Sequence, residues 1–524
     1  MSLTLRQLCE LRAGDSSGTT FLVTDEGEIS YLSFDQRVNC VANGLLDLGV
    51  KRDTVVALLL GNREEFVVAW FALAKLGAIA VPVNVAFLAP EARYLLEHSG
   101  AALLVTEPEL YEHAIAPVRG ELEGVRRVVM VAGEPPLPGD LRFADLLAAR
   151  SDPPPPVAVD ALFDPFTILY TSGTTGHPKG CVLPQSYFPL NGAALCHGMG
   201  VGSSDRLLMP LPLFHVNAEI TVAGAMVNRA AYILRPRFSA TAFWSDARRF
   251  GATAFNHVGT MITILLKQEP GPGDRDHTVR VACGGGAPAQ LISEFERRFG
   301  VALVELYATT ESCMDTMGSV HSSGGAQPKG TAGSPVWFKE MAIRGPEGEF
   351  LTPGEVGQIV TRPKIPGTMM LEYFREPEAT AEVMADGWFH SGDLGRLDER
   401  GTLTFVDREK HIVRRSGENI SSLDVERVLK EHPAIFEVAV VPVKDEIRGE
   451  EVKACVVLRQ EARASFDPRE LIAFCEGKLA AFKVPRYVKV YEALPTTETQ
   501  RIKKVALKAE LEPLAGAFDR EAAT

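Results

Sequence analysis

Two hydrophobic patterns alternate along the N-terminal part of the chain. Segments with apolar residues at helical spacing are each followed by a short apolar run rich in β-branched residues. The helical segments and the runs that follow them are, in order, 34–48 and 54–60, 63–76 and 79–83, and 90–98 and 103–106. Helices that alternate with wholly apolar strands are typical of βαβ units, whose parallel sheet is covered on both faces. The pattern therefore predicts an α/β fold.

The pattern changes farther along the chain. Proline-rich stretches at 134–139 and 151–156 suit neither a helix nor a central strand, so we expect surface connections there. After about residue 352 the chain becomes rich in strands and turns, and after residue 408 a compact mixture of helix and strand returns. We therefore expect a large N-terminal domain, residues 1–408, of layered helices and sheets with a β-rich subdomain, and a small α+β C-terminal domain, residues 409–524.

Composition and charge exclude several classes of protein. Of the 524 residues, 46% are apolar and 23% are charged, which is typical of globular proteins and not of disordered or collagenous ones. The 54 basic and 67 acidic residues give a net charge of −13, which argues against a nucleic acid or an anionic membrane as a partner.

The cysteines and the apolar stretches indicate the compartment. Eight cysteines are scattered without a C-x-x-C pair, so they signal neither a zinc site nor a disulfide framework, and they favour a reducing compartment. Charged residues interrupt positions 1–12, where a signal peptide would be apolar. The stretch 67–88 is interrupted by Lys75 and Pro82 and reads as a buried helix leading into a strand. We therefore expect a cytoplasmic protein without a membrane span.

The most informative segment is 167–183, with the sequence TILYTSGTTGHPKGCVL. Its glycines let backbone N–H groups converge on an oxyanion, its hydroxyl groups add donors, and Lys179 adds a positive charge, as a phosphate site requires. The segment is not a Walker A loop, because Lys179 is followed by Gly180 and not by Ser or Thr. A flexible turn is the alternative, but the unbroken run of Thr, Ser and Gly before Pro-Lys-Gly favours a nucleotide phosphate.

The sequence YTSGTTGHPKG resembles the signature loop of the adenylate-forming superfamily, which includes acyl-CoA synthetases, adenylation domains of peptide synthetases and luciferases. Further motifs of this superfamily follow in order over nearly the whole chain, namely PLFH at 212–215, GGGAP at 284–288, YATTE at 307–311, WFHSGD at 388–393, and DREK through RRSGEN at 407–419. Within the superfamily, segments 366–380, 414–421 and 481–485 look most like the crotonobetaine/carnitine CoA ligases.

The resemblance implies a reaction in two steps. A carboxylate attacks the α-phosphate of ATP to give acyl-AMP and pyrophosphate, and a thiol, that of coenzyme A, then displaces AMP. Both steps move negative charge over phosphates and oxyanions, so positioning and electrostatics should dominate over covalent catalysis. The implied substrates and cofactors are a small carboxylic acid, ATP, coenzyme A and Mg²⁺, and the small C-terminal domain is expected to be mobile between the steps. A homodimer is left open.

The resemblance assigns the phosphates and the metal to two motifs. The expected phosphate ligands are Thr171, Ser172, Gly173, Thr174, Thr175, Gly176 and Lys179. Thr174 is also counted among the catalytic residues. Glu311, preceded by Thr310, matches the carboxylate that holds Mg²⁺, a hard cation that takes one or two carboxylates together with phosphate oxygens. The alternative for Glu311 is a surface residue near a helix N-terminus.

The nucleoside is assigned in the same way. Tyr307 is expected to lie against adenine, and Gly285, Gly286 and Ala287 let the backbone approach that ring or the acyl group. Ala308 stands where the family usually has glycine, and its methyl group would narrow the site.

Residues of the last motifs complete the assignment. Asp393 matches the carboxylate that accepts hydrogen bonds from the ribose, and Arg408 is expected on the same sugar or on the α-phosphate. A β-turn is the alternative interpretation of the Ser-Gly-Asp sequence at Asp393. Lys410 falls at the hinge of the family, where the C-terminal domain rotates. The candidates for contacting AMP or coenzyme A are Arg414, Ser416, Gly417 and Asn419.

The acyl site is expected around the PLFH motif. His215 matches an aromatic gate beside the acyl phosphate, although a lone histidine is more often structural. In the same register Asn217, Glu219 and Thr221, together with Ala308, would line the acyl pocket. Because a long-chain acyl pocket should be apolar, we expect a short or polar acid. A quaternary ammonium acid facing Glu219 is one option, and it fails if Glu219 points to solvent.

The chain departs from the family at the catalytic lysine. Relatives have a Gly-Lys-Ile segment, where this chain has Gln500 and Arg501 in place of the glycine and the lysine. Arginine keeps the positive charge, but its planar head is larger, so the exchange is not conservative. We expect Arg501 to take the catalytic role, with Lys503 and Lys504 as alternatives.

Two other functions stay open at this stage. The chain could hand its acyl group to a carrier protein, or it could be a non-catalytic AMP-binding regulator, which the altered lysine makes conceivable. A hydrolase of the G-x-S-x-G type is not indicated, because the sequence lacks that motif.

Overall fold

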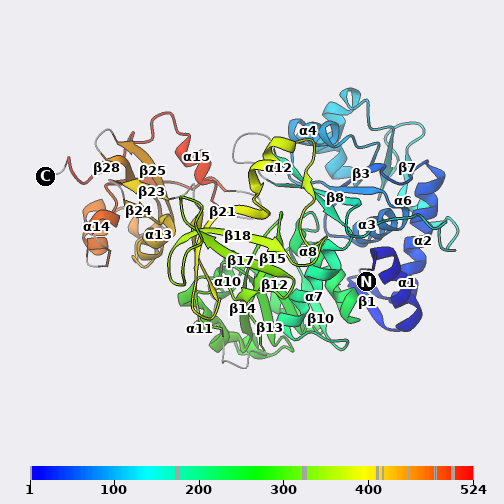
Figure 1. Cartoon of the computed structure of the whole chain (residues 1–524), viewed down its shortest axis with the longest axis horizontal. Coiled ribbons are helices and arrows are strands. Elements are labelled where there is room, and N and C mark those ends of the chain that lie inside the picture. The colour runs from blue at the N-terminus through cyan, green and yellow to red at the C-terminus, as the bar shows by residue number, and fades with distance from the viewer. Residues whose placement is uncertain are drawn as a thin grey trace. The chain divides into compact units, whose positions relative to one another are not determined.

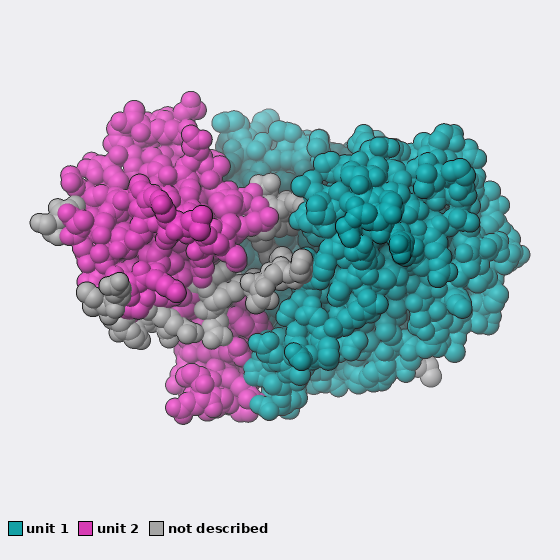
Figure 2. Space-filling model, turned by 90° about the horizontal axis from the view of Figure 1, so that it is seen from above, with its two compact units in different colours: residues 1–341, 361–390, 401–403 teal, residues 342–360, 391–400, 404–524 magenta. Residues whose placement is uncertain are grey.

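The structure is a computed structural model that describes residues 3–171, 178–320, 327–408, 412–415, 418–445, 448–476, 478–479, 481–496 and 502–522. The side chains of Arg408, Arg414, Glu418, Asn419 and Asp424 lie outside this description. The chain forms two compact units, which Figure 2 colours separately. Unit 1 contains residues 1–341, 361–390 and 401–403, and unit 2 contains residues 342–360, 391–400 and 404–524. The domain boundary at residue 408 stays a prediction.

Unit 1 contains an eight-stranded sheet that is parallel except at one edge. Its strands are, in spatial order, β19 (Glu372–Tyr373), β9 (Lys179–Pro184), β8 (Pro165–Thr171), β4 (Ile79–Pro82), β3 (Val55–Leu59), β5 (Leu103–Thr106), β6 (Arg127–Met130) and β7 (Leu141–Arg142). The reversed strand is β9, which runs antiparallel to both of its neighbours, β8 and β19. The predicted helices of this region are α2 (Tyr31–Asp47), α3 (Glu64–Leu76) and α4 (Ala89–Ser99). The predicted alternation of helix and strand is therefore confirmed.

Helix α3 is buried on every side, as the apolar stretch 67–88 predicts, and the chain then enters β4. Its single charged residue in the buried part, Lys75, is fully buried and donates to Asp35 Oδ1 at 2.5 Å and to Asn39 Oδ1 at 2.7 Å. This pairing satisfies the charge inside the core. None of the helices among the described residues combines the length and the apolar character needed to cross a bilayer.

A second, nine-stranded sheet of unit 1 carries the PLFH, GGGAP and YATTE motifs. Its strands are, in spatial order, β16 (Ser334–Pro335), β15 (Cys313–Met317), β14 (Ala302–Thr309), β13 (Val281–Gly285), β12 (Ala254–Val258), β10 (Arg206–Met209), β11 (Ala231–Leu234), β1 (Thr20–Thr24) and β2 (Gly27–Ser30). The strands from β14 to β1 are parallel. Parallel strands end on the same edge, so the motif residues that follow β13 and β14 are brought together there.

Helices cover both faces of the nine-stranded sheet (Figure 1). On one face lie α7 (Tyr187–Met199) and α8 (Val216–Asn228), which approach closely because a Cβ atom at Gly192 would lie 2.4 Å from the Ile220 carbonyl oxygen. On the other face Phe255 of β12 packs on Phe243 of α9 (Phe243–Arg249), with ring centroids 4.9 Å apart. The same face carries α10 (Gly259–Leu266) and α11 (Ala289–Phe299). The remaining helices of unit 1 are α1 (Leu5–Asp15), α5 (Pro108–Leu110), α6 (Phe143–Leu147) and α12 (Pro377–Val383).

The rest of the chain contains the predicted β-rich and α+β parts. A five-stranded sheet consists of β17 (Lys339–Arg344), β18 (Gly357–Pro363), β21 (Trp388–Leu397), β20 (Met384–Ala385) and β22 (Leu403–Arg408). The sheet of unit 2 consists of β24 (Glu418–Ile420), β23 (Val413–Arg415), β25 (Ile435–Asp445), β26 (Gly449–Leu458), β27 (Tyr487–Tyr491) and β28 (Phe518–Asp519). Its helices are α13 (Ser422–Lys430), α14 (Pro468–Glu476) and α15 (Lys504–Lys508).

Candidate active site

The predicted phosphate segment joins β8 to β9, an antiparallel pair in which Thr171 lies opposite Lys179. The Thr171 hydroxyl group faces the Lys179 carbonyl oxygen at 3.4 Å. The hairpin therefore holds the first and last of the predicted phosphate ligands next to each other. The other predicted ligands, Ser172, Gly173, Thr174, Thr175 and Gly176, lie outside the described residues.

Tyr373 connects the predicted phosphate lysine with the predicted metal carboxylate. Lys179 Nζ lies 5.1 Å from the centre of the Tyr373 ring, within the range of a cation–π contact. The Tyr373 hydroxyl group donates to Glu311 Oε1 at 2.8 Å. Burial and the neighbouring Glu311 charge raise the pKa of Tyr373, so its hydroxyl group stays a donor. Lys179 and Glu311, which are far apart in the sequence, are thus brought to one side chain.

Sequence reasoning missed Tyr373, although a signal for it was present. Tyr373 belongs to the segment 366–380, which we used only for its likeness to one subgroup of the family. Its place in β19, opposite Cys181 of β9, brings it to the end of the phosphate hairpin. A single tyrosine in a sequence does not by itself indicate a role. Only the pairing of β19 with β9 shows that Tyr373 lies near Lys179.

Backbone hydrogen bonds hold the turn that carries Glu311. The Tyr187 hydroxyl group donates to the Thr310 carbonyl oxygen at 2.8 Å, and the Met370 N–H donates to the Glu311 carbonyl oxygen at 2.7 Å. Cys313, at the end of the turn, has a φ angle of 59°, a left-handed conformation that is strained for a residue other than glycine. The turn is therefore fixed from two sides and does not depend on a ligand for its shape.

A buried polar cluster of Lys339, Ser312 and Asp315 holds the end of the same turn. Lys339 is fully buried, and its Nζ donates to the Ser312 carbonyl oxygen at 2.5 Å and lies 3.8 Å from Asp315 Oδ1. Burial lowers the pKa of Lys339 to about 8 and raises the pKa of Asp315. The pair is thus a structural support for the Glu311 turn.

The donor set at Glu311 fits Mg²⁺ that is shared with a nucleotide. The described residues contain no group of three or more His, Cys, Asp or Glu side chains that could hold a metal ion by themselves. A single carboxylate, oriented by the Tyr373 hydroxyl group and close to the predicted phosphate ligand Lys179, fits Mg²⁺ when phosphate oxygens and waters supply the other ligands.

The GGGAP motif forms a turn after β13. Gly286 has a φ angle of 83°, which favours glycine, and the following Ala287 N–H donates to Glu305 Oε2 at 3.1 Å. Tyr307 lies farther along β14 and is buried, whereas Ala308 is exposed. Ala308 therefore lies on the exposed side of β14, and the expected narrowing of the site by its methyl group stays a prediction.

Two of the polar residues predicted for the acyl pocket, Asn217 and Thr221, meet at the start of α8. His215 precedes this helix, and its ring centre lies 4.6 Å from that of Phe214. Asn256 of β12 donates through Nδ2 to Asn217 Oδ1 at 2.8 Å and to Thr221 Oγ1 at 2.7 Å. Two of the predicted pocket residues are thus joined by a third polar residue that the sequence analysis did not single out. An asparagine inside the apolar run AFNHV was the available signal.

Glu219 does not point to solvent. It is 1% exposed, neither carboxylate oxygen has a hydrogen-bond partner among the described residues, and burial raises the pKa of its carboxyl group well above the usual value. Glu219 is two residues from Asn217 and two from Thr221 along α8. At about 100° of rotation per residue, its side chain lies nearly on the opposite face of the helix. On its side of the helix is Tyr232 of β11, whose own pKa is raised by burial and by the Glu219 charge. Glu219 is therefore buried but does not share a face with Asn217 and Thr221.

The Ser-Gly-Asp segment of unit 2 lies inside β21, so the β-turn alternative is wrong. Gly392 has a φ angle of 68°, and the Asp393 N–H donates to Ser391 Oγ at 3.1 Å. Ser391 Oγ in turn donates to the Ile359 carbonyl oxygen at 2.7 Å. The irregular strand holds Asp393 in a largely buried position.

Other residues predicted for unit 2 are only partly described. Lys410, Ser416, Gly417 and Arg501 lie outside the described residues, as do the side chains of Arg408, Arg414 and Asn419. Lys504, one of the alternatives to Arg501, is buried and forms an ion pair with Glu426 at 2.7 Å. Lys503 is exposed. The ion pair makes Lys504 a poor alternative, because breaking it would leave a buried charge.

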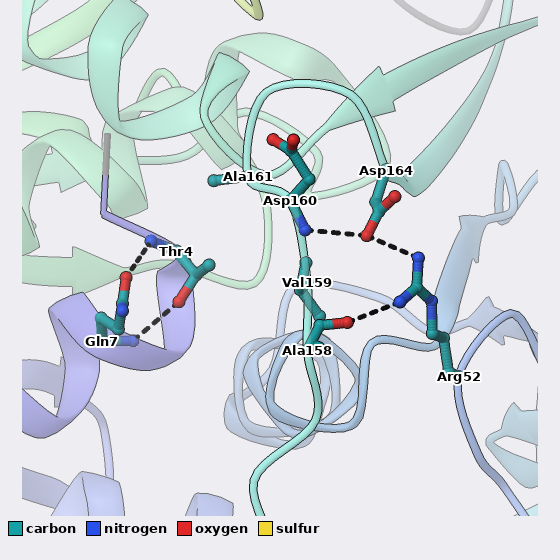
Figure 3. Close-up of a pocket in the computed structure, with 8 residues that line it drawn as sticks. All are labelled: Thr4, Gln7, Arg52, Ala158, Val159, Asp160, Ala161 and Asp164. Atoms are coloured by element: carbon teal, nitrogen blue, oxygen red, sulfur yellow. Dashed lines mark hydrogen bonds and ion pairs between the residues drawn. The ribbon is translucent and has the colours of Figure 1, made fainter. Parts of the chain in front are cut away.

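A surface hollow in unit 1 lies apart from all of these motifs (Figure 3). The residues that line it are Thr4, Gln7, Arg52, Ala158, Val159, Asp160, Ala161 and Asp164. Arg52 donates to the Ala158 carbonyl oxygen at 2.6 Å and to Asp164 Oδ2 at 2.8 Å, and Thr4 and Gln7 cap one another. Since these polar groups already satisfy each other, we assign no ligand to this hollow.

Comparison with known families identifies two matching segments. The family model described as AMP-binding enzyme matches residues 9–374, and the model described as AMP-binding enzyme C-terminal domain matches residues 424–501. The first match alone spans more than half of the chain, and it contains the phosphate hairpin, the Glu311 turn and the start of α8.

Comparison with individual proteins agrees with the family models. The chain is 34% identical over 523 residues to a crotonobetaine/carnitine–CoA ligase from Salmonella arizonae, covering 96% of this chain and 98% of the relative. It is 35% identical over 490 residues to the enzyme of the same name from Shigella flexneri, covering 91% and 93%.

Solved structures show the same architecture with an acyl-adenylate in place. An anthranilate CoA ligase in complex with anthranoyl-AMP has a TM-score of 0.86 and 26% identity, covering 97% of this chain and 96% of that one. An o-succinylbenzoate CoA synthetase from Bacillus subtilis in complex with its acyl-adenylate intermediate has a TM-score of 0.82 and 27% identity, covering 96% and 98%.

Proposed function

We propose that this chain, which belongs to the AMP-binding enzyme family and is an ATP-dependent, AMP-forming acyl-CoA ligase, acts on a short or polar carboxylic acid. The observation that supports this substrate class is the hydrogen-bonded group of Asn217, Thr221 and Asn256 at the start of α8. Thr221 and Asn256 are already buried, and Asn256 Oδ1 has no hydrogen-bond partner among the described residues, so a polar acyl group offers this oxygen a donor that a long alkyl chain lacks.

The proposed residue roles follow the movement of charge in the reaction. In the first step a carboxylate oxygen of the acid bonds to the α-phosphorus of ATP, and pyrophosphate leaves. In the second step the coenzyme A sulfur bonds to the acyl carbon, and AMP leaves. Lys179 offsets negative charge on the phosphates, and Tyr373 keeps the Glu311 carboxylate turned towards them. When bound, Mg²⁺ supplies further positive charge against the phosphates, and Glu311 is the residue that would hold it.

The remaining assignments are proposed on the motifs. The loop residues Ser172 to Gly176 contact phosphate, Tyr307 and the turn 285–287 contact the adenine side, and Asp393 with Arg408 contacts the ribose. Lys410 is the hinge, and Arg501 bridges the acyl carboxylate and the α-phosphate. Arg501 suits this role because a guanidinium group can donate to two oxygens at once.

A narrower candidate is an acid that carries a permanent positive charge. Glu219 is a buried acid without a hydrogen-bond partner among the described residues, and burial raises its pKa, which favours the neutral, protonated form. A cationic group beside Glu219 would favour the charged carboxylate and pair with it. The neighbouring Tyr232 ring could contact a quaternary ammonium group. Curated relatives that carry the name crotonobetaine/carnitine–CoA ligase support the same class. The ammonium end of such a substrate would then lie on the side of α8 that faces Tyr232.

A product assay tests the substrate class. The enzyme is incubated with ATP, Mg²⁺ and coenzyme A and a panel of acids that includes crotonobetaine, carnitine, butyrate and palmitate, and acyl-CoA products are measured by mass spectrometry. We expect products from short or polar acids and at least about 100-fold lower kcat/KM for palmitate, which corresponds to about 2.8 kcal/mol. Comparable turnover of palmitate would contradict the proposal.

The variant Glu219→Gln tests the role of the charge. This exchange keeps the shape of the side chain and removes its ability to carry a negative charge. If Glu219 pairs with the substrate cation, KM for crotonobetaine rises by about tenfold or more, whereas KM for its uncharged isostere, 5,5-dimethylhex-2-enoate, changes little. Equal effects on both acids would remove Glu219 from the substrate site and leave the polar-acid proposal intact.

A further inference from the structure

We propose that Glu305 and His257 form a buried acid–imidazole pair that positions the Gly286–Ala287 turn for the nucleotide. Neither residue belongs to a motif on which the proposed function depends. The inference rests on the proposed assignment of residues 285–287 to the nucleotide, and it makes Glu305 a positioning residue, since it would act through the turn and not touch the substrate itself.

The strand register places the two side chains on one face of the sheet. In the parallel strands β12, β13 and β14, His257 lies opposite Gly284, and Gly284 lies opposite Glu305. Residues in register on adjacent strands project to the same face. His257 Nε2 and Glu305 Oε1 are 3.5 Å apart across the intervening strand. This face is the one that α9, α10 and α11 cover, opposite Asn256 and the acyl residues.

Gly284 leaves the space through which the two side chains meet. A Cβ atom at this position would lie 2.0 Å from the His257 carbonyl oxygen and 2.8 Å from His257 Nδ1. Any side chain at position 284 would therefore displace the imidazole. The need for glycine at 284 therefore comes first from the close approach of the His257 backbone, and the missing side chain also leaves room for the imidazole.

Glu305 holds the turn through backbone donors. Its Oε2 accepts from the Ala287 N–H at 3.1 Å, and the Gly286 N–H also stabilises its charged form. The opposite side of the turn rests on the start of α10, where a Cβ atom at Gly259 would lie only 1.8 Å from the Gly286 carbonyl oxygen. The turn is thus fixed between α10 and the Glu305 carboxyl group. Its backbone position depends on both.

The pair carries no net charge at neutral pH. Burial raises the pKa of Glu305 to about 8 and lowers the pKa of His257 to about 4. Glu305 Oε1 and His257 Nε2 face each other at 3.5 Å without a hydrogen-bond partner among the described residues, and the neutral forms of both groups avoid leaving an unpaired charge there. Another titratable group near Glu305 is the buried thiol of Cys283, whose pKa is raised by burial and by the Glu305 charge. It too is neutral at pH 7.

Loss of the Glu305 proton would change nucleotide binding. Above about pH 8 the carboxyl group becomes a buried negative charge directly beneath a turn that would contact a nucleotide, itself an anion. Like charges at close range in a poorly solvated site repel. We therefore expect the affinity for AMP to fall as the pH rises through 8, and we expect this fall to depend on Glu305.

The test measures AMP binding at pH 7.0, 8.0 and 9.0 by calorimetry, in a range above the second pKa of the AMP phosphate, which is about 6, so that the charge of the ligand changes little. For the wild type we expect Kd to rise by about fivefold between pH 7 and pH 9. Glu305→Gln, which cannot take a charge but keeps an acceptor for the Ala287 N–H, should bind as the wild type does at pH 7 and lose little affinity at pH 9. Glu305→Ala should bind about tenfold more weakly at every pH. Glu294→Gln, an exposed residue on α11, is the matched control and should follow the wild type.

Two results would overturn the inference. A fall in affinity that is the same in Glu305→Gln as in the wild type would show that another group titrates. Wild-type affinity in Glu305→Ala would show that the turn does not depend on the carboxyl group. The acid specificity of the enzyme has no influence on either result.

Stability measurements test the pair without any ligand. A carboxyl group whose pKa is higher in the folded than in the unfolded protein stabilises the fold at low pH, and this contribution is lost as the pH rises through about 8. The wild type should therefore lose stability between pH 5 and pH 8 relative to Glu305→Gln. Identical pH profiles of the two proteins would contradict a protonated Glu305, even if the wild type failed to bind AMP.

Discussion

Tyr373 contacts two residues to which the proposed function gives different roles, Lys179 at the phosphates and Glu311 at the metal ion. Its ring lies against Lys179 Nζ, and its hydroxyl group donates to Glu311. A donor to a metal-binding carboxylate fixes which oxygen faces the metal, and such partners affect metal affinity without touching the ion. The geometry therefore makes Tyr373 a positioning residue for Glu311.

The variant Tyr373→Phe should show this effect. It keeps the ring against Lys179 and removes only the hydrogen bond to Glu311. We expect the Mg²⁺ concentration for half-maximal pyrophosphate release to rise by about tenfold, with little change in the binding of AMP measured without metal.

Tyr491→Phe is the matched control for this prediction. In unit 2 the Tyr491 hydroxyl group donates to Glu510 Oε1 at 2.7 Å, so the control removes the same kind of bond away from the site. An unchanged Mg²⁺ requirement in Tyr373→Phe would mean that Glu311 does not depend on its phenol partner.

At the scale of elements, one carboxylate connects β22, α13 and α15 within unit 2. Asp407, at the end of β22, accepts from Ser422 Oγ at 2.8 Å and from the Leu423 N–H at 3.2 Å. It therefore caps α13 from another element. Lys504 of α15 donates to Ser422 Oγ at 2.5 Å and pairs with Glu426 of α13. Asp407, three residues before the predicted hinge at Lys410, is thus held by hydrogen bonds to α13.

Replacing Asp407 with alanine should loosen the start of α13. The first helical N–H groups and the Ser422 hydroxyl group lose their acceptor, which costs about 1–3 kcal/mol. Hydrogen exchange of residues 422–430 should become faster. Asp467→Ala is the control, because the Asp467 carboxylate accepts from the Arg469 N–H at 2.9 Å and its loss should affect α14 only. Faster exchange spread evenly over unit 2 in Asp407→Ala would contradict a local cap.

The elements were predictable because each depends on a local pattern. The alternation of helical spacing and β-branched runs predicts α2, α3 and α4 to within a few residues. The partners of the site residues depend instead on register between distant strands. Tyr373 and Glu311 are 62 positions apart, and Asn256 lies 39 positions from Asn217. No local pattern predicts such pairs, so Tyr373, Asn256 and Glu305 were found only in the structure.

At the scale of the whole molecule, the motif residues are divided between the two units. Lys179, Tyr307 and Glu311 belong to unit 1, whereas Asp393 and Arg501 belong to unit 2. The proposed residue roles are therefore assigned to residues of both units. Arg501, which stands where relatives have a lysine, is the residue by which unit 2 would take part in the first step of the proposed reaction.

Variants of Arg501 test this contribution. Arg501→Ala should lower the rate of pyrophosphate release by about 100-fold or more, while conversion of supplied acyl-AMP and coenzyme A to acyl-CoA changes little, since only the first step uses the bridge. Arg501→Lys should restore most of the rate. Lys503→Ala, at an exposed position next to this segment, is the control. Pyrophosphate release at the wild-type rate in Arg501→Ala would remove this residue from the site.

The route through acyl-AMP is the central claim, and isotope transfer tests it most directly. The acid is labelled with ¹⁸O in both carboxylate oxygens and incubated with the enzyme, ATP, Mg²⁺ and coenzyme A. We predict that AMP acquires one ¹⁸O atom for each acyl-CoA formed and that pyrophosphate acquires none, because the carboxylate oxygen bonded to the α-phosphorus leaves with AMP. Label in pyrophosphate or in free phosphate, or acyl-CoA formed without labelled AMP, would contradict the account.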